Sequence, residues 1–484
     1  MSFFVNRNFR LMNKTFGLML CSSIPAFSLA GCGTQPRNDD RPNVLVILLD
    51  DAGYNDFGFM GCPDLLTPNI DSLAYTGVIF SDAHVSASVS GPSRCGLLTG
   101  RYQQRNGYEC NLGGKLGMGL DEETMGDIFL RNGYHTACIG KWHQGDAPEY
   151  HPNRRGFEHF YGFISGSRSY FYRPGKDDRP GDLHNLQNDG IQLRFDGYLT
   201  DVLADEAASY IEKNADADKP FLMYLAFNAV HTPMEATAED LARFEGHPRQ
   251  KLAAMTWAVD RGVGKVVHAL KKTGKFDNTL IFFLSDNGGA HNNFSRNTPL
   301  KGFKGNKFEG GHRVPFFLVY GDRFKERYEG LTSSLDILPT AMAAAGIDPA
   351  DTKSPLDGTN LLPYLRGEKD GDPHEMLFWR KNNQAAVRMG DYKYIRVQGV
   401  GERLYDLRNN LQENRDLCNS KPEIRALMSD SLDNWQAELV NPVLWDEGNW
   451  EAVNIDIHRN LMNNLPVDCH TPAEFRAKYG KRAK

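Results

Sequence analysis

The chain has 484 residues, of which 40% are hydrophobic and 24% are charged, and its formal net charge is −6. This composition is typical of a globular protein with a large core. An acidic balance argues against a nucleic-acid-binding surface, which needs clustered positive charge, so we expect no nucleic-acid partner. The length allows two or three domains.

The N-terminal segment is typical of an export signal rather than of a folded domain. Arg7, Arg10 and Lys14 give it a basic start, and residues 16–30 form a mostly apolar run that is too short to span a bilayer. We therefore expect the segment to be removed during export.

The end of this segment, Leu-Ala-Gly followed by Cys32, resembles the lipobox of bacterial lipoproteins. Cleavage there would make residues 1–31 a lipoprotein signal peptide, Cys32 the lipidated residue and residues 32–40 a polar tether. A plain signal peptide followed by a chance cysteine is the alternative. We expect an exported bacterial lipoprotein that a lipid anchor holds in the outer membrane, at either its periplasmic or its outer face.

Residues 43–49 form a continuous apolar run, the pattern of a parallel strand buried on both faces. The run ends in Asp50 and Asp51, and functional groups of open α/β sheets gather outside the carboxyl ends of the strands. Two adjacent carboxylates are costly to bury without a cation, so we interpret them as metal ligands. A solvated acidic turn is the alternative.

Residues 67–77 predict a short helix and residues 78–80 a strand, and a second short helix follows at residues 90–101. Pro92 suits a first helical position and Gly100 a stop, which places Ser90 just ahead of the helix N-terminus. The helix dipole favours negative charge there, and Arg94 adds a permanent cation. An ordinary N-cap serine is the alternative interpretation of Ser90.

Three later apolar runs also predict buried strands that end in chemically active side chains. They are residues 135–139 before Lys141 and His143, residues 221–226 before His231, and residues 280–284 before Asp286 and Asn287. Residues 255–270 repeat apolar side chains at helical spacing and predict a helix that covers the sheet. Because parallel strands present their carboxyl ends at one edge, we expect all these side chains to meet there.

Residues 151–172 are rich in aromatic and arginine side chains, which could stack on sugar rings and bind anionic groups. A partly buried aromatic cluster under a long loop is the alternative. Our candidate substrate-binding residues are Arg168 and Tyr170 from this segment, together with His291 and Arg380.

The pattern changes near residue 372, where short apolar runs alternate with turns as far as residue 407. They predict an antiparallel sheet, with a helix over residues 424–439 packed against it. We therefore divide the mature chain into a catalytic domain, residues 41–371, and a C-terminal subdomain, residues 372–484. Residues beyond 441 carry no functional signal that we recognise.

Residues 90–101 read Ser-Gly-Pro-Ser-Arg-Cys-Gly-Leu-Leu-Thr-Gly-Arg. This string resembles the signature of the type I, formylglycine-dependent sulfatases at every fixed position, in its serine-type version. Residues 140–143, 299–304 and 309–315 resemble further blocks of that family. Gln144 stands where Leu is usual and Lys301 where Arg is commoner. The resemblance covers the chain from residue 41 to about residue 417.

The resemblance implies the fold of the alkaline-phosphatase-like superfamily. We expect an α/β protein with a large mixed, mostly parallel sheet sandwiched by helices, and a smaller C-terminal α+β subdomain with an antiparallel sheet. It also implies that Ser90, rather than Cys95, is oxidised to formylglycine (3-oxoalanine) by an anaerobic sulfatase-maturating radical enzyme before export.

The resemblance further implies the roles of the site residues. The implied catalytic residues are Ser90, Arg94, Lys141, His143, His231 and Lys304. Among them, His231 would protonate the leaving oxygen and His143 would assist the release of sulfate. The implied metal ligands are Asp50, Asp51, Asp286 and Asn287. Such an all-oxygen set selects a hard cation, for which we expect one Ca²⁺, with Mg²⁺ as the alternative.

The sequence therefore predicts a sulfuric ester hydrolase that removes sulfate from a sulfated carbohydrate. Galactose or N-acetylgalactosamine sulfates of host glycans are our first choice of substrate. A phosphate or phosphonate ester hydrolase of the same superfamily is one alternative. A glycan-binding lipoprotein that kept the fold without catalysis is another.

Overall fold

The computed structural model describes residues 40–111, 116–445 and 449–480, which all belong to one compact unit. The expected signal peptide, Cys32 and the tether up to residue 39 lie outside the described residues. None of the described helices has the length and apolar character needed to cross a membrane.

A ten-stranded mixed sheet forms the centre of the larger part of the unit, in the order β11-β2-β10-β9-β1-β8-β4-β5-β6-β7. The neighbours β9, β1, β8 and β4 run parallel to one another. The strands are β1 (Asn43–Leu49), β2 (Val78–Phe80), β4 (His135–Lys141), β5 (His159–Phe163), β6 (Gln187–Asn188), β7 (Ile191–Gln192), β8 (Phe221–Ala226), β9 (Thr279–Ser285), β10 (Phe316–Tyr320) and β11 (Glu326–Tyr328). The short strands β3 (Ala83–His84) and β12 (Thr332–Ser333) pair separately.

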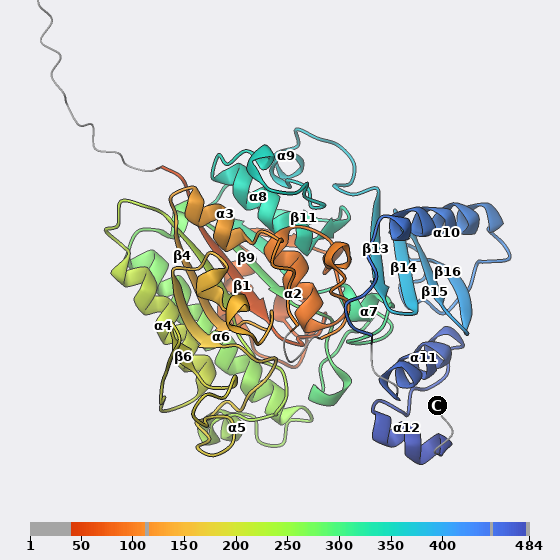
Figure 1. Cartoon of the computed structure of the whole chain (residues 1–484), viewed down its shortest axis with the longest axis horizontal. Helices are drawn as coiled ribbons and strands as arrows, with labels where there is room; N and C mark the ends of the chain where they lie inside the picture. The colour runs from red at the N-terminus through yellow and green to blue at the C-terminus, as the bar shows by residue number, and fades with distance from the viewer. Residues whose placement is uncertain (1–39, 112–115, 446–448, 481–484) are drawn as a thin grey trace, which may run out of the picture. The chain divides into compact units, whose positions relative to one another are not determined.

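Helices cover both faces of this sheet (Figure 1). Alternate residues of the central strand contribute to two different cores, with Leu45 and Ile47 in one and Val44 and Val46 in the other. Helices on the first side are α1 (Pro68–Ala74), α4 (Leu199–Lys213), α5 (Ala238–Arg243) and α6 (Gln250–Lys272). Helices on the second side are α2 (Ser90–Thr99), α3 (Met125–Arg131), α8 (Ile337–Ala344) and α9 (Leu362–Leu365). Burial on both faces explains why the parallel strands are continuously apolar.

A four-stranded antiparallel sheet follows, in chain order. Its strands are β13 (Met376–Lys381), β14 (Gln384–Met389), β15 (Tyr392–Val397) and β16 (Gly401–Asp406). The helix α10 (Pro422–Ala437) packs on one face, and α11 (Asn449–Met462) packs on the other. The last helix is α12 (Pro472–Tyr479). The period-two alternation of β13 fits this arrangement, since Trp379 faces α11 and Phe378 faces α10.

The predicted fold class is confirmed, and one local detail differs. Helix α2 begins at Ser90 itself, with Val89 as an extended N-cap, so Ser90 lies inside the first turn rather than ahead of it. Its hydroxyl does not cap the helix and is directed to buried side chains instead. The domain boundary expected at residue 372 falls between α9 and β13, within the single compact unit, and stays a prediction.

Candidate active site

The carboxyl ends of four adjacent parallel strands bring the predicted residues together. Asp50 and Asp51 follow β1, and Asp286 and Asn287 follow β9, whose Ser285 pairs with Leu49 in register. Lys141 is the last residue of β4, and His231 lies in the loop after β8. The expectation that these strand ends share one edge is confirmed by the strand order.

Three carboxylates at this edge each hold a separate cation, and all of these side chains are buried except Lys304, which is 19% exposed. The pairs are Lys141 Nζ with Asp50 Oδ2 at 2.6 Å, Lys304 Nζ with Asp51 Oδ1 at 2.6 Å, and Arg94 Nη2 with Asp286 Oδ2 at 2.8 Å. Mutual compensation is what makes such a concentration of buried charge tolerable.

The pairing sets the ionisation of the carboxylates. Burial by itself raises the pKa of Asp50 and of Asp51. The charges of Lys141 and His231 outweigh this effect at Asp50 and hold its pKa below the usual value. The charges of Lys304 and His231 do the same at Asp51. Burial and the charge of Asp50 raise the pKa of Asp286. Asp50 and Asp51 are therefore carboxylates at neutral pH.

Ser90 sits directly against two oxygen acceptors. Its Oγ lies 3.2 Å from Asp50 Oδ1 and 3.2 Å from Asn287 Oδ1. A hydroxyl has one hydrogen and can donate to only one of them at a time. The amide of Asn287 is oriented by its Nδ2, which donates to Asp51 Oδ1 at 2.7 Å. The Asn287 oxygen is therefore directed toward Ser90.

This donor set fits a hard metal cation. Asp50, Asp51, Asp286 and Asn287 present only oxygen atoms, and two of these oxygens meet at one hydroxyl that cannot satisfy both. Asp50 and Asp51, with His231, also form one of two groups of potential metal ligands among the described residues. Oxygen donors of this kind suit Ca²⁺ or Mg²⁺.

His231 is held with one ring nitrogen toward the site. Its Nδ1 lies 2.6 Å from its neighbour's carbonyl, Thr232 O, so this nitrogen carries the hydrogen, and Nε2 lies 3.6 Å from Asp51 Oδ2. The buried hydroxyl of Tyr170 lies 2.6 Å from Asn228 O and 2.8 Å from His231 O. Tyr170, predicted as a substrate contact, therefore donates its hydroxyl hydrogen to the backbone of the loop that carries His231.

His143 approaches the site from the loop after β4, with its backbone in the left-handed region at φ 57°. Its Nδ1 is buried and has no hydrogen-bond partner among the described residues. Burial, followed by the charges of Lys141 and Arg94, holds the pKa of His143 well below its usual value, so the ring is neutral. The unusual Gln144 ties this loop to α2, since its Nε2 donates to Gly91 O at 3.0 Å.

A cavity of about 520 Å³ opens at this edge. Asp51, His231, Lys304 and the predicted His291 line its inner side. Burial and the neighbouring His470 lower the pKa of His291 to about 4, so its ring is neutral at pH 7. The size is that of a site enclosing a small-molecule ligand.

Two of the predicted substrate contacts lie elsewhere, since neither Arg168 nor Arg380 is among the described residues that line the cavity. Arg168 is buried and makes a bidentate pair with Asp178 at 3.0 Å. The Arg380 Nε donates to the buried Glu109 at 2.7 Å. Both arginines hold segments of the fold together, which corrects the substrate-binding role predicted for them.

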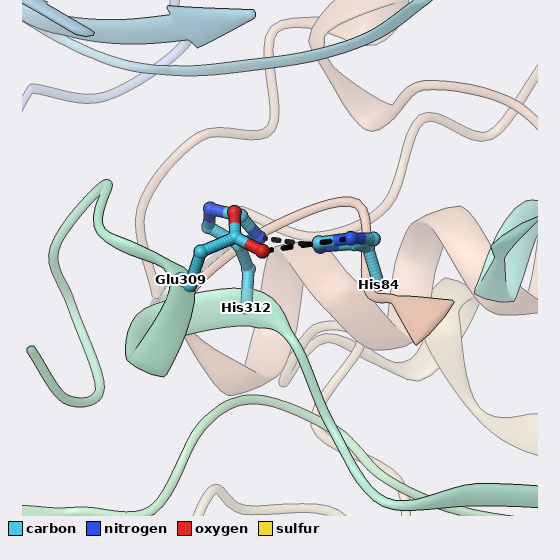
Figure 2. Close-up of side chains that lie close together, drawn as sticks. All are labelled: His84, Glu309 and His312. Atoms are coloured by element: carbon cyan, nitrogen blue, oxygen red, sulfur yellow. Dashed lines mark hydrogen bonds and ion pairs between the residues drawn. The ribbon is translucent and has the colours of Figure 1, made fainter. Parts of the chain in front are cut away.

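A second group of potential metal ligands, His84, Glu309 and His312, lies outside this cavity. Figure 2 shows the rings of His84 and His312 directed at each other, with the Glu309 carboxylate beside them. Lys393 Nζ lies 2.7 Å from Glu309 Oε1 and 2.8 Å from His312 Nε2. An ammonium thus pairs with two of the three potential ligands, and Arg388 adds a second cation beside Glu309.

The hydrogen bonds of this second group have one consistent direction. Lys393 donates to His312 Nε2, His312 Nδ1 donates to His84 Nδ1 at 3.0 Å, and His84 Nε2 donates to Asp82 at 2.8 Å. Burial lowers the pKa of both histidines, in keeping with two neutral rings. Because Lys393 belongs to β15, the network joins the antiparallel sheet to the rest of the unit.

The sequence reasoning missed the other side of the cavity. The C-terminal tail, in which no functional signal was found, supplies Leu444, Trp445, Trp450, Asn454, Ile457 and His470. These residues match no motif, and the two tryptophans in an otherwise polar stretch were the one available signal.

Comparisons with known proteins agree with this geometry. The family model described as Sulfatase matches residues 42–347. Over 402 residues the chain is 31% identical to the uncharacterized sulfatase YdeN of Escherichia coli K12, covering 72% of this chain and 70% of that protein. Over 404 residues it is 30% identical to the N-acetylgalactosamine-6-sulfatase of Canis lupus familiaris, covering 78% of this chain and 74% of that protein.

The fold matches solved structures as well. The crystal structure of Ps i-CgsB superposes with a TM-score of 0.79 and 37% sequence identity, covering 86% of this chain and 96% of that chain. Ps i-CgsB is also known in complex with k-i-k-neocarrahexaose. Together with the site described above, these matches show that the chain belongs to the sulfatase family and is a sulfuric ester hydrolase.

Proposed function

We propose that this enzyme removes sulfate from a sulfated carbohydrate by means of formylglycine formed from Ser90. The observation that carries the proposal is the position of Ser90, whose Oγ lies 3.2 Å from Asp50 and Asn287 within a buried cluster of cations. The hydrated aldehyde supplies one hydroxyl to attack sulfur and a second through which sulfate can be released. An unmodified serine has no such route for release.

The cations of the site would bind the sulfate group and stabilise its negative charge. Arg94, Lys141 and Lys304 are placed to hold sulfate oxygens and to stabilise the negative charge that develops on them. Asp50, Asp51, Asp286 and Asn287 would hold a Ca²⁺ ion, which supplies further positive charge at the sulfate. We favour Ca²⁺ over Mg²⁺ because the ligand set is large and rich in carboxylates.

Two histidines handle protons. His231, with Nδ1 fixed by the Thr232 carbonyl, presents Nε2 to the cavity and can protonate the leaving sugar oxygen. His143 is neutral because of its low pKa and can accept a proton when sulfate is released. Asp286 would help to deprotonate the attacking hydroxyl.

Two relatives support the proposed substrate class. One is an N-acetylgalactosamine-6-sulfatase, and the structural neighbour Ps i-CgsB has been crystallised with a neocarrahexaose. We therefore propose a galactose or N-acetylgalactosamine sulfate within a glycan. We also propose that the chain is matured by the anaerobic radical enzyme, exported, and anchored in the outer membrane through Cys32.

The decisive experiment is mass spectrometry of the peptide that contains Ser90, from protein purified from its native source. We expect a residue two hydrogens lighter than serine, and protein from a host without the maturating enzyme serves as the unmodified control. Sulfate release from a panel of sulfated mono- and disaccharides then identifies the sugar. Turnover by protein whose Ser90 remains plain serine would overturn the formylglycine proposal.

Metal dependence is tested on the same mature protein. Dialysis against a chelator should abolish turnover, and adding Ca²⁺ back should restore it better than adding Mg²⁺. Full activity in the metal-free protein would contradict the proposed ligand set.

The remaining alternative is phosphate or phosphonate ester hydrolysis. A phosphonate monoester hydrolase of Agrobacterium radiobacter shares the fold, with a TM-score of 0.61 and 20% identity, which shows the fold alone. Turnover of an aryl sulfate compared with the matching aryl phosphate separates the two activities. A preference for the phosphate would overturn our proposal.

A further inference from the structure

The cavity has two unlike sides. The inner side carries Asp51, His231, His291 and Lys304, whereas the outer side consists of the tail residues Leu444, Trp445, Trp450, Asn454, Ile457 and His470, which we call the tail wall. The proposed chemistry uses His231 and Lys304 of the inner side. It gives the tail wall no role.

The tail wall is anchored to the segment that carries Lys304. The backbone N–H of Lys307 donates to His458 Nε2 of α11 at 3.1 Å. Lys301 Nζ donates to Glu413 O at 3.0 Å and to Asn464 Oδ1 at 2.6 Å. Lys301, the departure from the usual Arg of the family, thus contributes to this anchoring. The wall and the catalytic lysine are therefore held by shared hydrogen bonds.

The inner and outer sides also meet through aromatic contacts. The rings of His291 and His470 stack with centroids 3.9 Å apart and an interplanar angle of 14°. Phe303 packs against both rings at 5.5 Å and 5.3 Å. The cavity is thus bounded by flat aromatic surfaces where it passes from the sulfate-binding edge to the tail.

Two tryptophans stand out because they line the cavity and yet remain in water. Trp445 is 46% exposed and Trp450 is 48% exposed. Large apolar rings left uncovered at a cavity are typical of ligand contacts. An indole offers a flat apolar face, onto which the C–H face of a sugar ring can pack, and a polar N–H at its edge.

The charge of the cavity lining suits the same kind of ligand. Lys304 brings an ammonium to the lining. Asp51, which is paired with Lys304, is the one carboxylate among the described lining residues. Flat apolar rings combined with hydrogen-bonding and cationic groups match the mixed surface of an anionic sugar chain.

We propose that the tail wall is a binding subsite for the sugar ring next to the sulfated one, so that the enzyme selects sulfated oligosaccharides over the corresponding sulfated monosaccharide. This inference rests on the proposed function, because it assumes that a sulfated sugar occupies the inner side of the cavity. Trp445 and Trp450 provide the stacking faces. These residues bind substrate and take no part in the chemical step.

The test is a comparison of kcat/KM for substrates of increasing length. The mature wild-type protein is assayed on galactose sulfates and N-acetylgalactosamine sulfates and on size-graded sulfated oligosaccharides that carry the same sulfate. In the series that it desulfates, kcat/KM should be at least 10-fold higher for the oligosaccharide than for the monosaccharide. Trp445→Ala and Trp450→Ala should each lower kcat/KM for the oligosaccharide about 10-fold, mainly by raising KM, and leave the monosaccharide value unchanged.

Matched variants distinguish stacking from folding. Trp450→Phe keeps a flat ring and should recover most of the kcat/KM that Trp450→Ala loses on the oligosaccharide. Tyr75→Ala is the control, because Tyr75 is 61% exposed and lies outside the cavity lining. It should leave kcat/KM unchanged on both substrates. Equal kcat/KM for both lengths in the wild type, or equal losses on both substrates in the variants, would overturn the subsite. Failure to desulfate any sugar of the panel would instead overturn the proposed function, and the subsite with it.

Discussion

The charged cluster at the strand ends and the tail wall of the cavity differ in how their residues are held. At the strand ends, Asp50, Lys141 and Arg94 are fully buried, and their charges are paired at distances below 3 Å. On the tail wall, Trp445 and Trp450 are about half exposed and carry no charge. The chemical side is thus fixed by mutual compensation of buried charges, whereas the outer side depends on surface contacts that tolerate change. Substitutions should therefore have very different consequences on the two sides.

The largest effect is expected at the buried pair of Lys141 and Asp50. Lys141→Met leaves a fully buried carboxylate without its cation, which should lower the free energy of unfolding by about 3–5 kcal/mol. Turnover should also be lost, because one of the sulfate-binding cations is gone. Chemical denaturation and sulfate release measure the two effects.

The matched control is Lys265→Met on α6. Lys265 Nζ lies 2.7 Å from Asp205 Oδ1, nearly the same distance, but both side chains are exposed. Solvent screens such pairs, so the loss should be about 0–1 kcal/mol with full activity retained. Similar losses in the two variants would show that burial does not distinguish the two lysines.

An intermediate effect is expected at His231, which lines the inner side of the cavity. His231→Ala should lower turnover of sugar sulfates by about 10²–10⁴-fold, the usual contribution of a general acid. An aryl sulfate has a good leaving group that needs no protonation, so its turnover should fall much less. Equal losses on the two substrates would argue against the acid role.

The smallest effect is expected at His458, which anchors the tail wall. Burial lowers the pKa of His458 from its ordinary value near 6.5 to about 3, so the folded protein holds this ring neutral while the unfolded chain protonates it. The stability that it contributes is therefore complete above pH 6.5 and is lost as the pH falls toward 3. In that window the free energy of unfolding should fall by about 1 kcal/mol per pH unit from this group.

His458→Gln isolates that contribution, because glutamine can still accept from the Lys307 N–H and does not titrate. The variant should lose about 1 kcal/mol at pH 7 and show a flatter pH dependence than the wild type, measured by urea unfolding between pH 4 and pH 7. If the free energy of unfolding depended on pH in the same way in both proteins, the proposed contribution of His458 would be wrong.

Strand patterns predicted the four adjacent parallel strands at the centre of the sheet and the location of the site. Residues 43–49 and 221–226 were expected as buried strands and form β1 and β8 with the same bounds. Asp50, Lys141, His231 and Asp286 were expected to meet because parallel strands align their ends, and this holds. Their catalytic roles and the formylglycine at Ser90 stay predictions.

The misplaced residues share a physical reason. Arg168, Tyr170 and Arg380 have side chains that could bind a sugar, but their partners Asp178, Asn228 and Glu109 come from other segments. A pattern of residue types shows what a side chain can bind, and it does not show which partner satisfies it. Only the folded chain decides between a buried ion pair and a free ligand contact.

The sequence by itself determined the central sheet and the chemistry at its edge, because hydrophobic runs and the groups that follow them are local properties of the chain. The tertiary structure decided which surface faces that chemistry. Trp450 and His470 are about 150–420 residues distant in sequence from Lys304 and Asp51, which line the same cavity, and docking of α11 through His458 brings them there. No local pattern encodes such a contact, since it depends on burial and hydrogen bonds formed between distant segments.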